Sequence, residues 1–357
     1  MNAPSEAAVL PNAPKAGSLR AGSLRVPIMG TWVPRRGVLI AGGAAVLTVL
    51  LAIVALGLGD LPLSPTEVVQ ALFATDGGFT STVVRDWRLP RVLGAIVFGS
   101  ALAVSGAVFQ SLTRNPLGSP DVIGFSTGAF TGALIAITVV GTGVVTTSAG
   151  ALIGGLLTAV VVYLLAYQGG LQGFRLIIVG IAVTAMLSAV NLFLLLRAQE
   201  EVAMSASIWG AGTLALLGWP TLVPAVVGLL LCLPGLLLVP PLRQLELGDD
   251  AAAAHGVGVE RARLGLVLFA VALIAIVTAA AGPIAFVALA APQVARRLAG
   301  SAGIPMVSSA MVGAFLLLGA DLIAQHALPV DVPVGIVTVV LGGLYLLSLL
   351  IQEARSR

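Results

Sequence analysis

Residues 264–294, LGLVLFAVALIAIVTAAAGPIAFVALAAPQV, run for 31 positions without a charged side chain. One helix of that length would extend about 46 Å, whereas the hydrocarbon core of a bilayer is about 30 Å thick. Gly282 and Pro283 stand inside the stretch, and this pair breaks helices and favours a turn. We therefore predict two membrane-crossing helices here, the second of them short.

The rest of the chain is equally apolar. Hydrophobic residues make up 58% of the 357 positions and charged residues only 9%, against about 25% charged residues in an ordinary soluble domain. Polar interruptions divide the chain into nine apolar segments, and the division of residues 264–294 makes ten. Several reach the roughly 20 residues that a membrane span needs, among them 37–59, 92–112, 174–196 and 220–239. This composition excludes a water-soluble fold and predicts an all-α membrane protein with about ten transmembrane helices.

The distribution of basic residues predicts the orientation of these helices. With ten spans and a cytoplasmic N-terminus, fourteen of the eighteen Lys and Arg residues fall on the cytoplasmic side, as the positive-inside rule requires. The other four are Arg85, Arg88, Arg91 and Arg197. We therefore predict that both termini are cytoplasmic.

The ends of the chain differ from its middle. Residues 1–36 are rich in Pro, Ala, Gly and Ser and have no long apolar run, which predicts a disordered basic cytoplasmic tail. They do not suit a signal peptide, because the first apolar segment begins at Gly37 and is too long. The transmembrane domain is predicted to cover residues 37–352, followed by a cytoplasmic C-terminal tail of residues 353–357.

Several kinds of chemistry are excluded by residue counts. The only lysine, Lys15, lies between Pro14 and Ala16, so the phosphate-binding loop that ends in Gly-Lys-Ser/Thr is absent. One cysteine, Cys232, and two histidines are too few for a conventional Cys/His metal site. We expect a chain that is not an enzyme and binds no cofactor of its own.

Two loops carry unusual sequences. The segment RDWRLPR at 85–91 places three arginines on the predicted outer side, where they either anchor a helix end at the interface or bind an acidic partner. On the cytoplasmic side, Pro116 and Pro120 prevent a continuous helix. That loop is either a tight turn with Asp121 capping the next helix or a gate. Asp321, near the outer end of a helix, suits a hydrogen-bonded structural carboxylate better than a proton relay.

Three motifs together resemble one family. They are RLPR at 88–91 with the small-residue helix that follows it, NPLGSPDVIGFSTGA at 115–129, and GPIAFVAL at 282–289 with Pro292. This order is similar to that of the FecCD family, the permease subunits of binding-protein-dependent ABC importers for iron siderophores, haem and cobalamin. The similarity runs from about residue 37 to residue 352. The second motif looks most like the permeases for ferric enterobactin and related catecholate siderophores.

The resemblance implies a type II ABC importer architecture and a role for several residues. Arg88 and Arg91 would meet carboxylates of a substrate-binding protein, and Asn115 and Leu117 would stand at the cytoplasmic gate. A short helix within 244–259 would dock onto the ATPase. Its implied docking residues are Glu246, Gly248, Asp249, Asp250, His255 and Gly256.

The chain departs from the family pattern at five positions. His255 replaces a leucine, Ala285 and Ala288 replace glycines, Gln293 stands where histidine is frequent, and Gln325 stands where some relatives have a further docking arginine. These changes affect details of the implied interfaces and leave the family resemblance intact.

The resemblance also implies the partners. They are a second permease subunit, two cytoplasmic ATPases that hold ATP and Mg, an extracytoplasmic binding protein, membrane lipid and an iron-siderophore substrate, with no nucleic acid. The expected location is the inner membrane of a bacterium. The alternatives are a haem or cobalamin permease of the same family and a secondary transporter driven by an ion gradient. A membrane enzyme would need converging catalytic side chains, and the sequence contains no such pattern.

Overall fold

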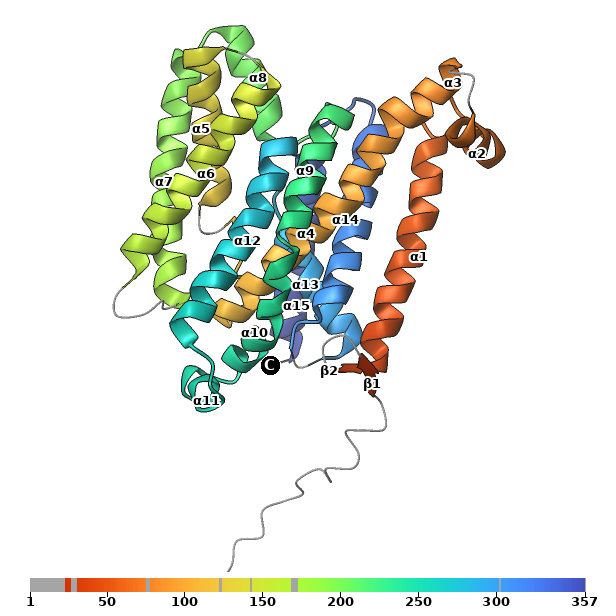
Figure 1. The fold of residues 1–357 in the computed structure, drawn as a ribbon. Helices are drawn as coiled ribbons and strands as arrows, with labels where there is room; N and C mark the ends of the chain where they lie inside the picture. The colour runs from red at the N-terminus through yellow and green to blue at the C-terminus, as the bar shows by residue number, and fades with distance from the viewer. Residues whose placement is uncertain are drawn as a thin grey trace, which may run out of the picture.

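The computed structural model describes residues 23–26, 31–74, 78–121, 124–141, 143–167, 173–301 and 303–356. The fold is a helical bundle (Figure 1). Each of the ten predicted apolar segments contains a helix. These are α1 (Arg35–Gly57), α4 (Leu89–Thr113), α5 (Phe125–Val140), α6 (Val144–Ala166), α7 (Gly173–Arg197), α9 (Trp219–Leu231), α12 (Val259–Ala281), α13 (Val287–Ala299), α14 (Met306–His326) and α15 (Val334–Ser356).

Short elements connect the long helices. At one end of the bundle lie α2, α3 and α8, and at the other lie α10 and α11 (Figure 1). The short helices are α2 (Pro65–Phe73), α3 (Phe79–Thr82), the π-helical turn η1 (Val83–Arg88), α8 (Glu200–Gly210), the 3₁₀ turn η2 (Leu233–Leu238), α10 (Val239–Glu246) and α11 (Asp249–Ala254).

Within residues 1–36, for which the sequence predicts disorder, the structure describes residues 23–26 and 31–36, which form two strands and the start of a helix. Strands β1 (Ser23–Val26) and β2 (Thr31–Pro34) pair antiparallel, with Leu24 opposite Val33. Extended backbone suits the valines of these segments. Helix α1 begins at Arg35, two residues before the predicted start of the membrane domain. Residues 1–22 and 27–30 lie outside the described part of the chain.

Within the described residues, seven helical stretches are long and apolar enough to cross a membrane. They belong to α1, α3 through α4, α6, α7, α9 through α10, α12 and α14. Shorter apolar helices are α5 and the 334–348 part of α15, and α13 has only 13 residues. The chain is therefore a multi-pass membrane protein by its helix lengths and composition.

The predicted division of residues 264–294 is confirmed. Helix α12 ends at Ala281, and Gly282 follows with φ 73°, a left-handed conformation that suits glycine. Helix α13 begins at Val287 after Phe286, which also has positive φ. The chain therefore breaks at the Gly-Pro pair and starts a second, short helix.

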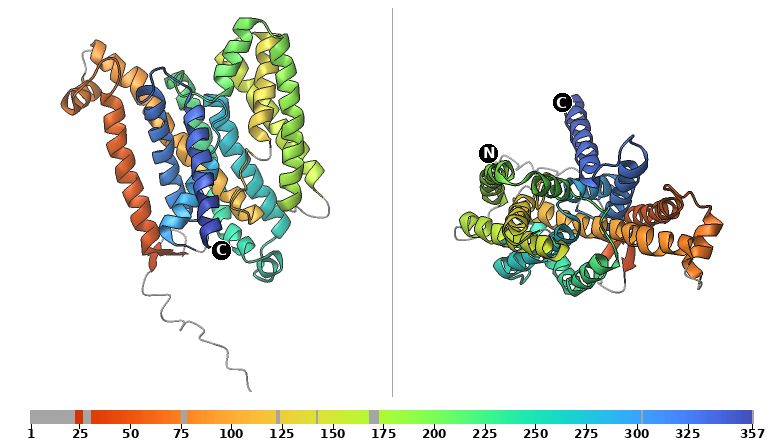
Figure 2. Two further views of the ribbon diagram at one scale, coloured as in Figure 1. Left: turned by 180° about the vertical axis from the view of Figure 1, so that it is seen from behind. Right: turned by 90° about the horizontal axis from the view of Figure 1, so that it is seen from above.

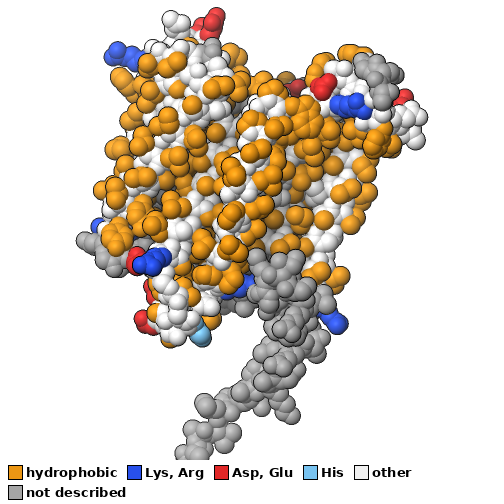
Figure 3. All heavy atoms as spheres, in the orientation of Figure 1, with side chains coloured by type: hydrophobic (Ala, Val, Ile, Leu, Met, Phe, Trp, Pro, Cys, Tyr) orange, Lys and Arg blue, Asp and Glu red, His pale blue; other side chains and the backbone are white. Residues whose placement is uncertain are grey.

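The surface has the distribution of side chains expected for a membrane protein. In Figure 3 hydrophobic side chains cover the middle of the molecule, and the charged groups gather at its two ends. The exposed apolar residues include Leu50 of α1, Leu157 of α6, Phe193 of α7 and Leu344 of α15. Seen from behind, the C-terminal end of α15 lies at the same end of the bundle as the β1–β2 hairpin (Figure 2).

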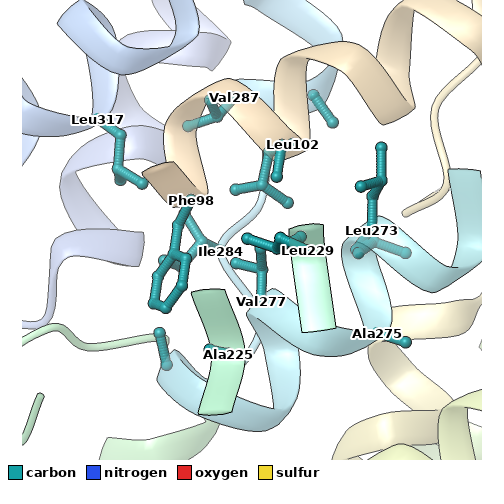
Figure 4. Packing of buried hydrophobic residues seen from close by; sticks show 14 of the residues in the cluster. Phe98, Leu102, Ala225, Leu229, Leu273, Ala275, Val277, Ile284, Val287 and Leu317 are labelled. Carbon is teal, nitrogen blue, oxygen red and sulfur yellow. The ribbon is translucent and has the colours of Figure 1, made fainter. Parts of the chain in front are cut away.

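Helix α4 runs through the core and packs against α12, α13 and α14. Its Phe98 and Leu102 are fully buried and lie among side chains of α9, α12 and α14 (Figure 4). Glycines allow the backbones to approach closely, since a Cβ on Gly99 would collide with the Gly313 carbonyl of α14. Small residues have the same role in many membrane helix interfaces, where close packing replaces the hydrophobic effect.

Gly106 is expected to tolerate no larger side chain. A Cβ at this position of α4 would overlap the backbone carbonyl of Ala288 at the start of α13, so Gly106→Val must push the two helices apart. We expect this substitution to lower the free energy of unfolding by about 1 to 3 kcal/mol or more, measured by thermal unfolding of the purified protein in detergent. Gly43→Val on α1 is the matched control, because nothing lies within 4 Å of its Cβ position. Equal shifts in both variants would contradict the packing described here.

Candidate functional site

The three arginines of the 85–91 segment bind groups within the chain. Arg88 donates from Nη1 to the Leu56 carbonyl and from Nη2 to the Leu61 carbonyl, both at 2.8 Å. It thereby holds the C-terminal end of α1, whose last carbonyls have no partner within the helix. Arg85 donates from Nε to the Leu72 carbonyl at 2.9 Å. Trp87, by contrast, is exposed.

Arg91 forms a buried ion pair with Asp321. Its Nη2 lies 2.9 Å from Asp321 Oδ1 and its Nε lies 3.0 Å from Oδ2, which is the bidentate geometry that arginine forms with carboxylates. Gln325 donates to the same Oδ2 at 2.7 Å. The Asp321 side chain is 2% exposed and that of Arg91 is 19% exposed. Asp321 therefore has the structural role expected from the sequence, and the pair joins α4 to α14.

A polar cavity of about 540 Å³ opens at this end of the bundle. Charged and polar groups from four parts of the chain line it, and some are already paired with one another. They are Asp60, Arg88, Arg91, Asp321, Gln325, His326 and Asp331. Docking of an acidic partner through Arg88 and Arg91 stays a prediction. Such docking would compete with the bonds that these two side chains make inside the chain.

The 114–121 loop follows α4 at the opposite end. Asn115 Oδ1 accepts the backbone N–H of Leu117 at 2.9 Å, and the Asn115 carbonyl accepts that of Gly118. These bonds form a tight turn in which the amide of Asn115 replaces a backbone acceptor. The Leu117 side chain is 52% exposed. The predicted gate residues are thus a turn-forming asparagine and an exposed apolar side chain beside it.

A buried pair of amides fixes this loop to α13. Gln293 Nε2 donates to Gln110 Oε1 at 2.5 Å and lies 3.4 Å from the Pro116 carbonyl. Gln110 in turn donates to the Leu289 carbonyl at 2.9 Å. Both side chains are buried. Gln293, a departure from the family pattern, therefore joins α4, α13 and the loop.

Asp121 does not cap α5, contrary to one interpretation of the sequence. The N-cap is Gly124 with φ 83°, without a side-chain cap. Asp121 Oδ1 instead accepts the Ser126 hydroxyl at 2.7 Å. Oδ2 is buried and has no hydrogen-bond partner among the described residues. Burial raises the pKa of this carboxyl to about 6, although the Ser126 hydroxyl and the Phe286 backbone N–H lower it.

The raised pKa of Asp121 predicts a stability that depends on pH. Between about pH 4 and pH 6 the native protein keeps a proton that the unfolded chain releases, so stability falls as the pH rises through this range. Asp121→Asn removes the titration. The free energy of unfolding of this variant minus that of the unsubstituted chain should therefore increase by up to about 3 kcal/mol between pH 4 and pH 7. Denaturant unfolding in detergent at several pH values measures this difference. A difference that stays constant with pH would contradict the buried carboxylate.

The segment predicted to dock onto the ATPase contains a short helix, as expected. Helix α11 begins after Gly248, with Asp249 and Asp250 in its first turn, and ends before Gly256, which has φ 83°. Asp250 and His255 are exposed, whereas Asp249 is partly covered. Asp249 Oδ1 lies 2.6 Å from Arg263 Nη2 and 3.0 Å from Arg114 Nη2. Glu246, on α10, accepts the Ser111 hydroxyl at 2.6 Å.

A second cavity, of about 610 Å³, lies between α5, α7 and α15. Apolar side chains dominate its wall, but one part is polar. This part consists of Ser126, Thr127, Ser188 and Asn191. Asn191 is buried, and its Oδ1 has no partner among the described residues. Ala285 of the α12–α13 break also lines this cavity, while Ala288 is buried against Gly106.

Sequence reasoning did not find the partners of these residues. Arg91 pairs with Asp321, Arg263 with Asp249, and Gln293 with Gln110. The two residues of each pair lie between 14 and 230 positions apart in the sequence. No local spacing predicts such contacts. An isolated acidic residue on an apolar helix, such as Asp321, is the one signal that an arginine must lie nearby.

Residues 47–352 match the FecCD transport family. The ferric enterobactin transport system permease protein FepG of Escherichia coli is 50% identical over 301 residues, which cover 84% of this chain and 91% of FepG. The achromobactin transport system permease protein CbrC of Dickeya dadantii is 38% identical, covering 87% of this chain and 90% of CbrC.

One solved structure has the same fold. It is a metal-chelate type ABC transporter in an inward-facing conformation, with a TM-score of 0.77 and 29% identity, covering 88% of this chain and 99% of that one. Nearly all of the helical bundle is covered by the family match, by the alignments with FepG and CbrC, and by the superposition on the solved structure. The chain belongs to the FecCD transport family and is an ABC importer permease.

Proposed function

We propose that this chain is the membrane-spanning subunit through which an ABC importer carries a ferric siderophore of the catecholate class into a bacterial cell. The observation that carries the substrate class is the 50% identity to FepG over most of both chains, which exceeds the 38% identity to CbrC. A separate ATPase, with ATP and Mg, supplies the energy, because the chain has no phosphate-binding loop.

The chain would cross the inner membrane ten times, with both termini in the cytoplasm. The β1–β2 hairpin, α11 and the C-terminal end of α15 lie at one end of the bundle, which is consistent with an even number of spans. The basic residues of the described chain at that end, among them Arg114, Arg243 and Arg261, support its assignment to the cytoplasm. The exposed apolar faces of α7 and α15 would contact lipid and a second permease subunit.

In this arrangement the two ends of the bundle have different partners. The cavity with Arg88 and Arg91 would face the binding protein, and α11 would face the ATPase. Closure of the ATPase pair would shift the populations of outward-open and inward-open states. Leu117, exposed beside the Asn115 turn, would close the inner opening of the path.

The second cavity suits a polar substrate. Its hydroxyl and amide groups on α5 and α7 include Ser126, Ser188 and Asn191. One buried oxygen of Asn191 has no hydrogen-bond partner in the part of the chain that the structure describes. Such groups can form hydrogen bonds with a hydrophilic compound, whereas the surrounding apolar wall holds no fixed charge. The binding protein, rather than this wall, would therefore select among siderophores.

Uptake by cells tests the substrate class. In a bacterium that lacks its own catecholate permease, this chain and its neighbouring transport genes should restore import of radioiron from ferric enterobactin. They should not restore import from a hydroxamate siderophore or from haem, nor import of labelled cobalamin. Restored import of haem or cobalamin instead would assign the chain to another substrate class of the same family.

A further inference from the structure

The residue before the predicted gate is bound to the predicted ATPase-docking helix. Arg114 ends α4 and directly precedes Asn115. Its Nη2 donates to the Leu245 carbonyl of α10 at 2.8 Å and to Asp249 Oδ1 of α11 at 3.0 Å. One side chain therefore connects the loop with both short helices of the docking segment.

Asp249 also binds an arginine of the transmembrane helix α12. Its Oδ1 also accepts from Nη2 of Arg263, at 2.6 Å, in the second turn of α12. The Arg263 side chain is only 14% exposed, whereas those of Arg114 and Asp249 are 49% and 46% exposed. Asp249 thus lies between one covered and one accessible arginine, so a movement of α11 changes its distance to both.

The backbone at Arg114 is held in an uncommon conformation. Its φ of 48° lies in the left-handed region, which residues other than glycine seldom occupy because Cβ approaches the following carbonyl. Such conformations persist where the surroundings fix them. Backbone N–H groups of Arg114 and Asn115 bond to the Ser111 and Gln110 carbonyls at this helix end. Further support comes from the side-chain bonds of Arg114 to Leu245 and Asp249. Their loss would allow Arg114 and the turn after it to rearrange.

We propose that Arg114, Asp249 and Arg263 form the mechanical link between the ATPase-facing helix α11 and the gate loop. This inference rests on the proposed function. When α11 moves, Asp249 pulls on Arg114 or releases it, and the Asn115–Leu117 turn follows because it is the next part of the chain. Asp249 is then a positioning residue that contacts the membrane domain, and Asp250 is the more exposed of the two carboxylates.

The link is tested by a double-mutant cycle in the complete transporter in proteoliposomes. The variants are Arg114→Gln, Asp249→Asn and the two combined. The readout is the number of ATP molecules hydrolysed for each substrate molecule imported. We expect each single variant to raise this ratio about two- to fivefold. This is the fold-change that corresponds to the interaction energy of a half-exposed ion pair. The combined variant should raise the ratio by less than the product of the two single effects, because the Arg114–Asp249 contact is lost in both single variants.

Two variants serve as controls. Glu260→Gln removes an exposed negative charge in the first turn of α12 and should leave the ratio unchanged. Arg114→Lys keeps a charged donor at this position. Its ratio of ATP hydrolysed to substrate imported should therefore stay close to that of the unsubstituted chain. Fold-changes that multiply in the combined variant, or an Asp249→Asn variant that behaves like Glu260→Gln, would overturn the link.

A second readout needs no substrate. In a chain with Cys232→Ser and Leu117→Cys, reaction of the new thiol with a membrane-impermeant reagent should change with nucleotide state, and Asp249→Asn should abolish that change while the ATPase remains bound. Loss of ATPase binding instead would make Asp249 a direct docking residue and overturn the inference. Because this readout does not depend on the imported compound, a wrong substrate assignment and a wrong link give different results.

Discussion

Arg91→Ala is expected to lower the free energy of unfolding by about 3 to 5 kcal/mol, the usual cost of removing one partner of a buried ion pair. Asp321 keeps only 2% of its side chain exposed, so its carboxylate would remain in the bundle with Gln325 as the principal partner. The loss should appear as a lower midpoint of thermal or denaturant unfolding in detergent.

The double variant Arg91→Ala with Asp321→Ala separates the ion pair from general packing. It removes both charges and should be more stable than Arg91→Ala alone. Arg197→Ala is the matched control, because this arginine is exposed and contacts only the Phe193 ring, at 5.2 Å, among the contacts described. Its effect should stay below about 1 kcal/mol. Independent, additive losses at Arg91 and Asp321 would contradict the pairing.

Arg88→Glu is expected to weaken binding of the substrate-binding protein by about 2 kcal/mol or more, a loss of roughly 30-fold in affinity. The proposed partner is acidic, so a glutamate at this point of the outer cavity would repel it. Affinity should be measured with the purified protein in nanodiscs. The effect should shrink at high salt, because surface charges are then screened.

Arg88→Ala provides the control for this prediction. Both variants lose the two bonds from Arg88 to the Leu56 and Leu61 carbonyls, so any structural damage at the end of α1 is common to them. Only the glutamate adds repulsion. If the two variants bind equally well at low salt, Arg88 stabilises the helix end and has no part in docking.

Much of the helical arrangement could be predicted from local sequence. Runs of apolar residues located the helices, because a membrane span must satisfy its backbone hydrogen bonds internally and face lipid. The Gly282-Pro283 pair located the break between α12 and α13. The β1–β2 hairpin was missed, since its valines and leucine lie in a segment otherwise rich in Pro, Gly and Ser.

The sequence indicated which segments form the site, but it did not indicate which side chains contact one another there. Sequence motifs indicated the segments 85–91, 114–121 and 244–259, and the short helix α11 formed where an acidic start and a glycine stop favoured one. The partners of Arg91 and Asp249 come from distant helices. Their approach depends on the packing of the whole bundle, which no local pattern contains.

The central claim is tested most directly by the energy source of transport. Proteoliposomes should contain the chain with its partner subunits, enclosed ATP and Mg, and receive ferric enterobactin with its binding protein outside. The account predicts uptake that requires both ATP and the binding protein, and that stops when the lysine of the ATPase phosphate-binding loop is replaced. Uptake that continues without ATP and collapses when a proton or sodium gradient is removed would contradict it.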